Sequence, residues 1–372
     1  MNGSLTYPLE FRGNGWEYSK IYFVNLALTI LTLGIYSAWA KVRNKRYFYG
    51  NTLLAESSFE YHASPIQILK GRLLVVGGFF LYNIIAGAVP AISWLFLILF
   101  LILLPWLILK ATQFNLRNSS YRQIRFDFLG QMGDLFVCYV LLPVASAFTL
   151  WIAYPYAIFR QRQYMADNTR FGQSSFSFGG KSKEFFAAYF TAFMGIVILF
   201  VALGFIFGAS AQEFVQGFKE GLAQQQAQQQ AQQLVSMAAP VQEKPDPKVV
   251  ARVMLGVMAI YAGFILLSLL VMTYINTRIT NYFFNHLKLD YVRFKVDISF
   301  LKLLWIYLGN TVLILLTFGL FIPWAKVRAV KYKLSCVTVY AADLENYIAG
   351  EARNTKALGE EMSDFLDVDV GF

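Results

Sequence analysis

The sequence has few charged residues and very few of the residues that carry most enzyme chemistry. Only 15% of its 372 residues are Asp, Glu, Lys or Arg, and it contains two cysteines and two histidines. Soluble domains are about 25% charged, so this composition argues against an ordinary soluble protein. Two cysteines cannot build a disulfide framework or a Cys-rich metal site. Hydrophobic residues make up 57% of the chain and aromatic residues 17%, which excludes a disordered or fibrous protein.

Six runs of the chain contain no charged residue, and each is long enough to cross a bilayer. They are residues 21–40, 73–109, 135–159, 185–212, 253–277 and 303–325. A helix needs about 20 apolar residues to cross about 30 Å of hydrocarbon. The longest run therefore predicts two helices, 73–89 and 91–109, with a turn near residues 87–90. The sequence thus predicts seven hydrophobic segments in an all-α, polytopic integral membrane protein. The first run starts late and has no small-residue cleavage site, so we expect no cleaved signal peptide.

The ends of the first, fourth and seventh segments align without gaps. The three blocks run from Thr32 to Arg43, from Thr149 to Arg160 and from Thr317 to Arg328. Within them a threonine, an aromatic residue, an alanine and an arginine recur in register, and a tyrosine follows each arginine by four residues. This pattern predicts two three-segment repeats and a partial third one, with limits at 1–110, 111–277 and 278–341. We expect Arg43, Arg160 and Arg328 at equivalent places, at the cytoplasmic ends of equivalent helices.

Two further stretches differ from the rest in composition. Residues 213–248 are rich in glutamine and end in a Pro-containing stretch, which predicts a partly helical, solvated loop. Residues 342–372 contain eight acidic and two basic residues. We expect this acidic tail to be mobile.

A shorter motif recurs in the loops between the hydrophobic segments. It consists of an aromatic or aliphatic residue, a polar residue and a second aromatic or aliphatic residue. Its copies are Leu9-Glu10-Phe11, Phe59-Glu60-Tyr61, Phe126-Asp127-Phe128, Phe176-Ser177-Phe178 and Phe294-Lys295-Val296. Period-two alternation beside Gly, Ser and Asn predicts short β-strands outside the membrane. Anchoring of aromatic residues at the membrane interface is the alternative. The expected fold is therefore a helical bundle with internal repeats and short extramembrane β-hairpins.

The stretch from Phe11 to Tyr47 resembles a known family. The residues that carry the resemblance are Phe11-Arg-Gly-Asn-Gly-Trp16, Val24-Asn25, Leu31-Thr-Leu-Gly-Ile-Tyr36, Trp39-Ala40 and Lys45-Arg-Tyr47. They resemble the YjgN-like family of bacterial inner-membrane proteins of unknown function, and the similarity extends over residues 9–341. Ala38 stands where the family has proline, which Pro155 and Pro323 keep in the other copies. The second copy also has Trp151 for Gly and Ile158 for Lys. The resemblance implies an inner-membrane location and no particular reaction.

The distribution of charge leaves two topologies open. Five of the six loops have more Lys and Arg than Asp and Glu, whereas residues 213–252 are balanced at four of each. Positive charge concentrates in cytoplasmic loops. If the first, fourth and seventh segments enter and leave on one side, every basic loop and both termini are cytoplasmic and 213–252 is periplasmic. If all seven segments cross, two basic loops fall in the periplasm. The segment lengths favour the second scheme, the charges favour the first, and the C-terminus is cytoplasmic in both.

Polar residues within the hydrophobic segments form a candidate intramembrane site. The five candidates are Asn25, Thr32, Thr149, Asn310 and Thr317. Asn25 and Thr32 lie two helical turns apart on one face, and Asn310 and Thr317 repeat this spacing. Such faces could line a polar site between the repeats. Hydrogen bonding between or within helices is the alternative.

Basic residues gather just after three of the segments, at the depth of lipid headgroups. The candidate contacts are Lys41, Arg43, Lys45, Arg46, Arg160, Arg162, Lys326, Arg328 and Lys331. Each such charge is attracted to an anionic leaflet by about 1 kcal/mol. We therefore expect the lipid bilayer, and anionic lipids in particular, as the partner, and no nucleic acid.

The sequence contains no recognisable catalytic set. His62 and His286 have no second ligand at metal spacing, and Gly13-Asn14-Gly15 lacks the setting of a dinucleotide loop. We expect no catalytic, cofactor-binding or metal-binding residues and no enzyme activity. The function expected is that of a structural, lipid-interacting or partner-binding envelope protein. The alternative is a small-solute transporter or channel that uses the interface between the repeats.

Overall fold

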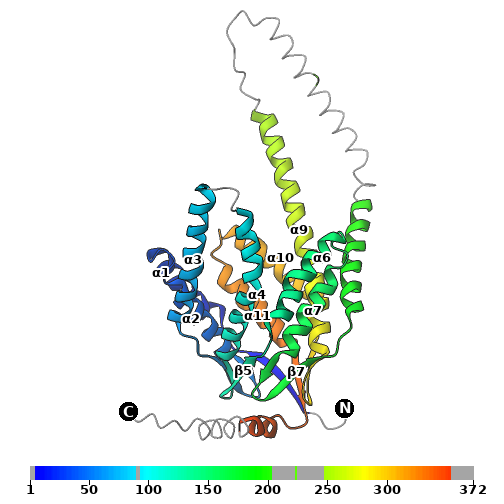
Figure 1. Cartoon of the computed structure of the whole chain (residues 1–372). Coiled ribbons are helices and arrows are strands. Elements are labelled where there is room, and N and C mark those ends of the chain that lie inside the picture. The colour runs from blue at the N-terminus through cyan, green and yellow to red at the C-terminus, as the bar shows by residue number, and fades with distance from the viewer. Residues whose placement is uncertain (1–4, 89–92, 203–222, 224–246, 353–372) are drawn as a thin grey trace, which may run out of the picture. The chain divides into compact units, whose positions relative to one another are not determined.

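The computed structural model describes residues 5–88, 93–202, 223 and 247–352, and the chain divides into two compact units (Figure 1). The first unit comprises Met1–Phe186 and Asn276–Phe372, and the second is Ala187–Ile275. Of the Gln-rich stretch 213–248, residues 213–222 and 224–246 lie outside the described residues. The same holds for residues 89 and 90 of the turn expected near 87–90 and for the tail from residue 353.

Ten short strands belong to the first unit. They are β1 (Leu5–Phe11), β2 (Thr52–Leu54), β3 (Ser57–Tyr61), β4 (Ser119–Tyr121), β5 (Ile124–Phe128), β6 (Thr169–Phe171), β7 (Ser174–Phe178), β8 (Leu287–Leu289), β9 (Val292–Val296) and β10 (Val337–Ala341). Each of the five aromatic–polar–aromatic motifs lies on one of these strands, namely on β1, β3, β5, β7 or β9.

Four of the strand pairs are hairpins of one design: a three-residue strand, a two-residue turn and a five-residue strand. In the β2–β3 turn, Ala55 and Glu56 have φ values of 45° and 61°; in the β4–β5 turn, Arg122 and Gln123 have values of 47° and 69°. Two successive positive φ values define a type I′ turn, whose twist matches the right-handed twist of the flanking strands. The turn therefore fixes the register, and Leu54 pairs with Ser57 as Tyr121 pairs with Ile124.

The hairpins join into one closed barrel, which corrects the expected fold. Every strand is antiparallel to both neighbours, in the order β1-β10-β9-β8-β7-β6-β5-β4-β3-β2. Closure comes from β1 and β10, which pair from Leu5↔Ala341 to Pro8↔Thr338. The prediction of an all-α bundle with isolated hairpins was wrong. Local alternation marks the single strands, but it carries no information on a pairing between opposite ends of the chain.

The barrel has its own hydrophobic core. Buried members of this core include Leu54, Tyr121, Phe171 and Leu289, each the last residue of a three-residue strand. Residues 344–352, at the start of the acidic tail, form a helix that adds Leu344, Tyr347 and Ile348 to the same core. Glu351, on this helix, accepts hydrogen bonds from Gln173 N at 2.8 Å and from Ser174 Oγ at 2.5 Å. This part of the tail is therefore docked on the barrel.

Three helix pairs of the first unit leave the barrel, turn and return to it. The first pair is α1 (Gly15–Leu31) and α2 (Ser37–Gly50). The second is the broken helix α5 (Met132–Phe136), η2 (Val137–Leu141) and α6 (Leu142–Phe148), followed by α7 (Tyr154–Asp167). The third is α10 (Phe300–Leu316) and α11 (Ile322–Ser335). These pairs, here called the re-entrant hairpins, contain the first, fourth and seventh hydrophobic segments.

The closed barrel decides between the two topologies. Each re-entrant hairpin starts at one barrel strand and ends at a neighbouring one, for example at β1 and β2. A single crossing between them would place strands of one barrel on both sides of a membrane. The scheme with seven crossings is therefore excluded, and the first, fourth and seventh segments enter and leave on the same side. The segment lengths of 20 to 25 residues were misleading because each run includes a turn and part of a returning helix.

Among the described residues, four helices are long and apolar enough to cross a membrane. They are Pro65–Gly87 within α3 (Pro65–Ala88), Trp94–Arg117 within α4 (Ser93–Arg117), the helix Ser182–Ala202, and Met254–Asn285 within α9 (Pro247–Asn285). The second unit consists, in its described residues, of the greater part of the last two helices. The expected repeat limits at 110/111 and 277/278 fall inside α4 and α9.

A tyrosine fixes the base of each re-entrant hairpin. Tyr47, Tyr164 and Tyr332 each bond to the backbone of the residue 33 positions earlier, which caps the outgoing helix. The asparagine side chains of Asn51 and Asn168 then cap the returning helices four residues after the first two tyrosines. These contacts recur in register, so the sequence repeat is also a structural repeat.

Candidate functional site

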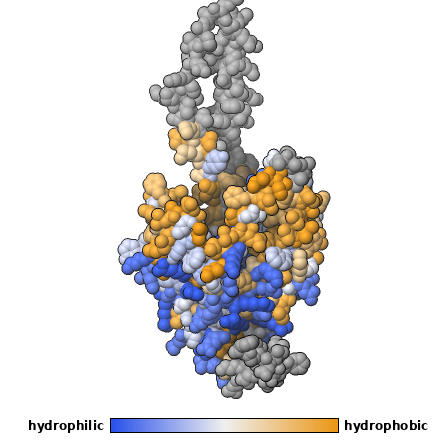
Figure 2. All heavy atoms as spheres, turned by 60° about the vertical axis from the view of Figure 1, so that its left-hand side comes forward, coloured by the Kyte–Doolittle hydropathy of each residue, from blue (hydrophilic) through white to orange (hydrophobic). Residues whose placement is uncertain are grey.

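The tips of the re-entrant hairpins are apolar and exposed. Leu33 is 95% exposed, Leu150 84% and Phe318 98%. On the face of the first unit that Figure 2 shows, hydrophobic residues gather around helix tips and hydrophilic residues around the barrel. Exposed side chains of this size at three equivalent tips are expected to insert into hydrocarbon, because their transfer out of water is favourable.

The candidate threonines organise these tips. Each threonine ends the outgoing helix, donates its hydroxyl to a carbonyl about one turn earlier, and accepts from the amide four residues later. At Thr32, Thr149 and Thr317 the donated bonds measure 2.7, 2.9 and 2.6 Å and the accepted ones 2.9, 3.1 and 3.0 Å. The chain reverses between them through positive φ angles, such as 50° at Leu33 and 91° at Gly34. The three hydroxyls are therefore committed to backbone groups. Each supplies an acceptor to an amide of the turn, which lipid could not supply, and adds a second bond to a carbonyl that already accepts from an amide.

The two candidate asparagines lie within their own hairpins. Asn25 is 4% exposed and donates to Asn44 Oδ1 at 3.2 Å, across α1 and α2. Asn310 is 5% exposed and donates to Ala325 O at 3.1 Å, across α10 and α11. The Oδ1 atoms of both side chains have no hydrogen-bond partner among the described residues. Each of the two asparagines thus connects the two helices of its own hairpin, the first or the third. Asn44, which completes the first pair, was missed because it lies among basic residues.

The returning helices carry the basic residues at matching positions. α2, α7 and α11 each have 14 residues, and Arg43, Arg160 and Arg328 are the seventh residue of each. All three are exposed. Their equivalence follows from this shared position, and the re-entrant topology places them on the same side of the membrane.

Eight of the nine candidate basic residues are exposed, and Lys45 is half-buried. Among the exposed ones, Arg46 donates to Tyr61 O and Ala63 O, and Arg160 donates to Gln163 Oε1. The ion pairs within the described ranges involve arginine or histidine and no lysine.

Three lysines line one cavity, which we call the lysine pocket. It has a volume of about 410 Å³ and is lined by Lys41 and Lys45 of α2 and by Lys326 of α11. Ser37 and Asn44 supply polar groups. Ala40, Phe48 and Tyr49 supply apolar walls. No carboxylate lines the pocket, so its field is positive.

Aromatic rings hold two of these lysines. Lys45 Nζ lies 4.5 Å from the centre of the Tyr61 ring and donates to Asn115 Oδ1 at 2.6 Å. Lys326 Nζ lies 4.8 Å from the centre of the Phe48 ring. Removal from water lowers the pKa of Lys45, with a smaller contribution from the charge of Lys41, and removal from water also lowers the pKa of Lys326. Ring faces stabilise the cations but bring no negative charge.

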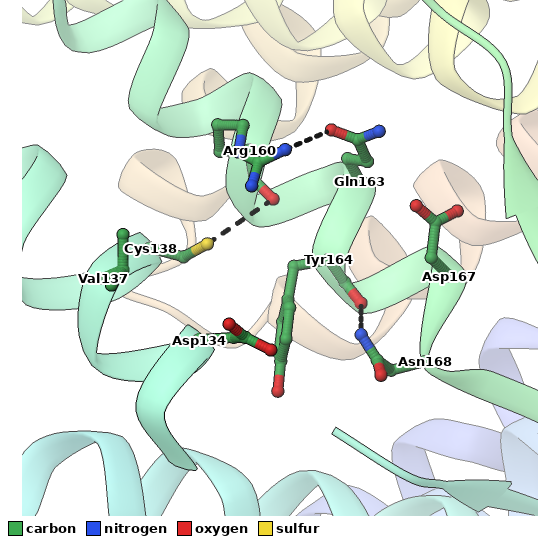
Figure 3. A pocket seen from close by; sticks show the side chains of 8 residues that line it. All are labelled: Asp134, Val137, Cys138, Arg160, Gln163, Tyr164, Asp167 and Asn168. Atoms are coloured by element: carbon green, nitrogen blue, oxygen red, sulfur yellow. Dashed lines mark hydrogen bonds between the residues drawn. The ribbon is translucent and has the colours of Figure 1, made fainter. Parts of the chain in front are cut away.

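A second cavity, of about 220 Å³, lies beside the second re-entrant hairpin (Figure 3). Its lining includes Asp134, Cys138, Arg160 and Asp167. Cys138 Sγ contacts Arg160 O at 3.9 Å, and burial raises the pKa of the Asp167 carboxyl. Within the described ranges, no three His, Cys, Asp or Glu side chains gather so that they could hold a metal ion. The cavity combines acidic and basic groups without an activated nucleophile.

The two histidines have structural contacts. His62 Nε2 lies 2.7 Å from Ser120 Oγ, between the hairpins β2–β3 and β4–β5. His286 Nδ1 lies 2.9 Å from Tyr282 O, and its ring lies against the Tyr282 ring with the centroids 4.1 Å apart and the planes tilted by 35°. His286 thus occupies the capping position that asparagine fills in other repeats.

Comparison with known proteins identifies the family. A family model for a bacterial protein of unknown function, DUF898, matches residues 6–365. The chain is 24% identical to the inner membrane protein YjgN of Salmonella typhimurium LT2 over 378 residues, which cover 91% of this chain and 90% of that protein. It is 30% identical to the inner membrane protein YjgN of Escherichia coli K12 over 145 residues, or 38% of this chain and 36% of that protein. No solved structure matches the chain significantly. The chain therefore belongs to the DUF898 family of bacterial proteins of unknown function, and the resemblance to YjgN is confirmed.

Proposed function

We propose that the protein is a non-catalytic, lipid-binding protein of the bacterial inner membrane. Its re-entrant hairpins insert into one leaflet, and the basic residues of the returning helices bind anionic headgroups there. The barrel and both termini lie in the cytoplasm in this proposal, and the Gln-rich stretch is periplasmic.

The observation that carries the proposal is that each re-entrant hairpin has an apolar tip and carries basic residues on its returning helix. In the first hairpin, Leu33 is at the tip, and Lys41 is the fifth residue of the helix that follows. At 1.5 Å per residue, Lys41 lies about 6 Å along the α2 axis from Ser37. A tip in the hydrocarbon therefore brings the lysine to the depth of headgroups, where each cation is attracted by about 1 kcal/mol.

The charge distribution supports the cytoplasmic side. The loops that contain the hairpin strands are basic, and all of these strands belong to the barrel. Moving Lys and Arg outward during insertion is unfavourable, so a barrel surrounded by basic loops is retained in the cytoplasm. The re-entrant topology allows this orientation without any basic loop in the periplasm.

The geometry of the asparagines favours lipid binding over solute transport. A transport site at the repeat interface would need Asn25 and Asn310 to face a shared polar path. Each of them instead bonds within its own helix pair. Proton- and ion-coupled transporters usually carry the ion on carboxylates within the membrane. The hydrophobic segments of this sequence contain no Asp or Glu.

Lipid selectivity tests the proposal directly. The full chain, purified in a mild detergent and stripped of native lipid, is offered equal amounts of phosphatidylglycerol and phosphatidylcholine, and bound lipid is counted by native mass spectrometry. We expect several-fold enrichment of phosphatidylglycerol that weakens at high salt, because exposed charges are screened. Equal binding of the two lipids would refute the proposal.

A further inference from the structure

We propose that the lysine pocket is a specific binding site for the phosphate group of one anionic phospholipid. This inference rests on the proposed function and assigns it to one place, where α2 and α11 meet. The ligand chemistry is a phosphate anion that carries an apolar or glycerol substituent.

The pocket combines cations from two repeats. Lys41 is the fifth residue of α2, and Lys326 is the fifth residue of α11, so the two are equivalent. The second repeat has Ile158 at the same position of α7. Helix α1 packs against α11, and Lys326 Nζ reaches Tyr18 Oη of α1 at 3.3 Å. Lysine therefore occurs in the two copies that share this pocket, and the copy outside it has an aliphatic residue.

The pocket contains positive charge that the protein does not neutralise. Its lining has three ammonium groups and no carboxylate, and none of the three takes part in an ion pair with a described residue. Cations of like sign repel one another and lose hydration where the protein covers them. An anion between them relieves both costs, and phosphate accepts hydrogen bonds from several ammonium groups at once.

The remaining lining fits a headgroup better than a free ion. The lining also includes Asn44, whose Oδ1 accepts from Asn25, and Ser37, whose hydroxyl donates to Gly34 O and accepts from Arg72. Phe48 and Tyr49 add apolar surface. The cavity, at about 410 Å³, is also within the range typical of small-molecule sites. A phosphate ester therefore gains contacts that inorganic phosphate lacks.

The test measures binding of short-chain dihexanoyl phosphatidylglycerol to the full chain in detergent. The pocket variant is the double substitution Lys41→Gln and Lys326→Gln; Lys45 is left unchanged because it holds Asn115. The matched control is Lys288→Gln with Arg293→Gln, which removes the same charge from the paired strands β8 and β9. At about 1 kcal/mol per headgroup contact, each lysine accounts for about fivefold in affinity. We expect the dissociation constant to rise about thirtyfold in the pocket variant and less than twofold in the control.

Each outcome has one meaning. If the pocket variant binds phosphatidylglycerol as the unaltered chain does, the pocket assignment is wrong, while the enrichment of phosphatidylglycerol over phosphatidylcholine still supports the proposed function. If the unaltered chain shows no such enrichment, both proposals fail. Inorganic phosphate that binds as tightly as phosphatidylglycerol would overturn the lipid as the occupant. The charge-conserving variant Lys41→Arg with Lys326→Arg controls for misfolding, and it should bind within about threefold of the unaltered chain.

Discussion

The tyrosines at the base of the re-entrant hairpins offer a graded test of the structural repeat. Tyr47 Oη accepts from Asn14 N and donates to Asn14 O, both at 2.8 Å, and the side chain is 7% exposed. Tyr164 Oη makes a single backbone bond, to Gln131 O at 2.7 Å, and is 8% exposed. Replacing either tyrosine by phenylalanine removes the hydroxyl. The carbonyls of Asn14 and Gln131 still accept from Tyr18 N and Leu135 N, whereas Asn14 N loses its partner.

The magnitudes follow from the hydrogen bonds that are lost. Tyr47→Phe removes two bonds and leaves the Asn14 amide without a partner, and it should lower the free energy of unfolding by about 2 kcal/mol, because a buried polar group without a partner costs about 1–3 kcal/mol. Tyr164→Phe removes one bond to a carbonyl that keeps its bond from Leu135 N, and it should cost about 1 kcal/mol. Tyr332, the third copy, is less buried and has a longer second bond of 3.4 Å, so water can replace the hydroxyl and the loss should be smaller still.

Equilibrium unfolding in detergent with urea, followed by tryptophan fluorescence, measures this order. Tyr22→Phe is the matched control, because the Tyr22 hydroxyl has no hydrogen bond to the described residues and its ring contacts stay intact. If Tyr47→Phe unfolds like this control, or if Tyr332→Phe costs more than Tyr47→Phe, the assignment of these hydroxyls as equivalent anchors is wrong.

Three other perturbations test the topology, the tips and one carboxyl. Thr317→Val removes the hydroxyl that caps α11 and should destabilise the protein by about 1 kcal/mol in unfolding experiments, whereas Thr317→Ser should cost clearly less. Burial raises the pKa of Asp167 in the folded state, so its contribution to stability falls as the pH rises from the pKa of the unfolded chain through the raised one; Asp167→Asn, which can still accept from Phe178 N, should remove this part of the pH dependence. In a cysteine-free background, Gln226→Cys should react with an impermeant maleimide in intact cells and Glu60→Cys, on barrel strand β3, should not; the opposite pattern would place the barrel in the periplasm.

The sequence predicts the single elements well. The charge-free runs mark every apolar helix, and the aromatic–polar–aromatic motif marks one strand in each hairpin. Both signals are local: hydrophobic length for the helices and period-two alternation for the strands. The sequence repeat also predicts the equivalence of the three arginines, because gapless alignment preserves position within equal helices.

Properties that depend on distant contacts could not be predicted. Barrel closure needs the pairing of Leu5 with Ala341, and neither strand differs in sequence from an edge strand. Each re-entrant turn depends on two successive residues with positive φ. The second of the two is glycine in the first and third copies, which marks the turn in the sequence, but in the second copy Leu150 and Trp151 have the positive φ values. The lysine pocket could not be predicted either, because Lys326 lies far from Lys41 in the chain and only the packing of α1 against α11 brings them together.

The pairing of β1 with β10 sets the order in which the molecule can be completed during synthesis. β1 is made before the other nine strands, and its second neighbour is not made until Val337–Ala341 is translated. The helices between them are threaded into the membrane while the ring of strands is still open. Because such a distant contact is entropically costly to form, we expect ring closure late in folding. A chain that stops before Val337 therefore exposes two unpaired strand edges, on β1 and β9, which makes a truncated product prone to aggregation and recognisable to quality-control proteases.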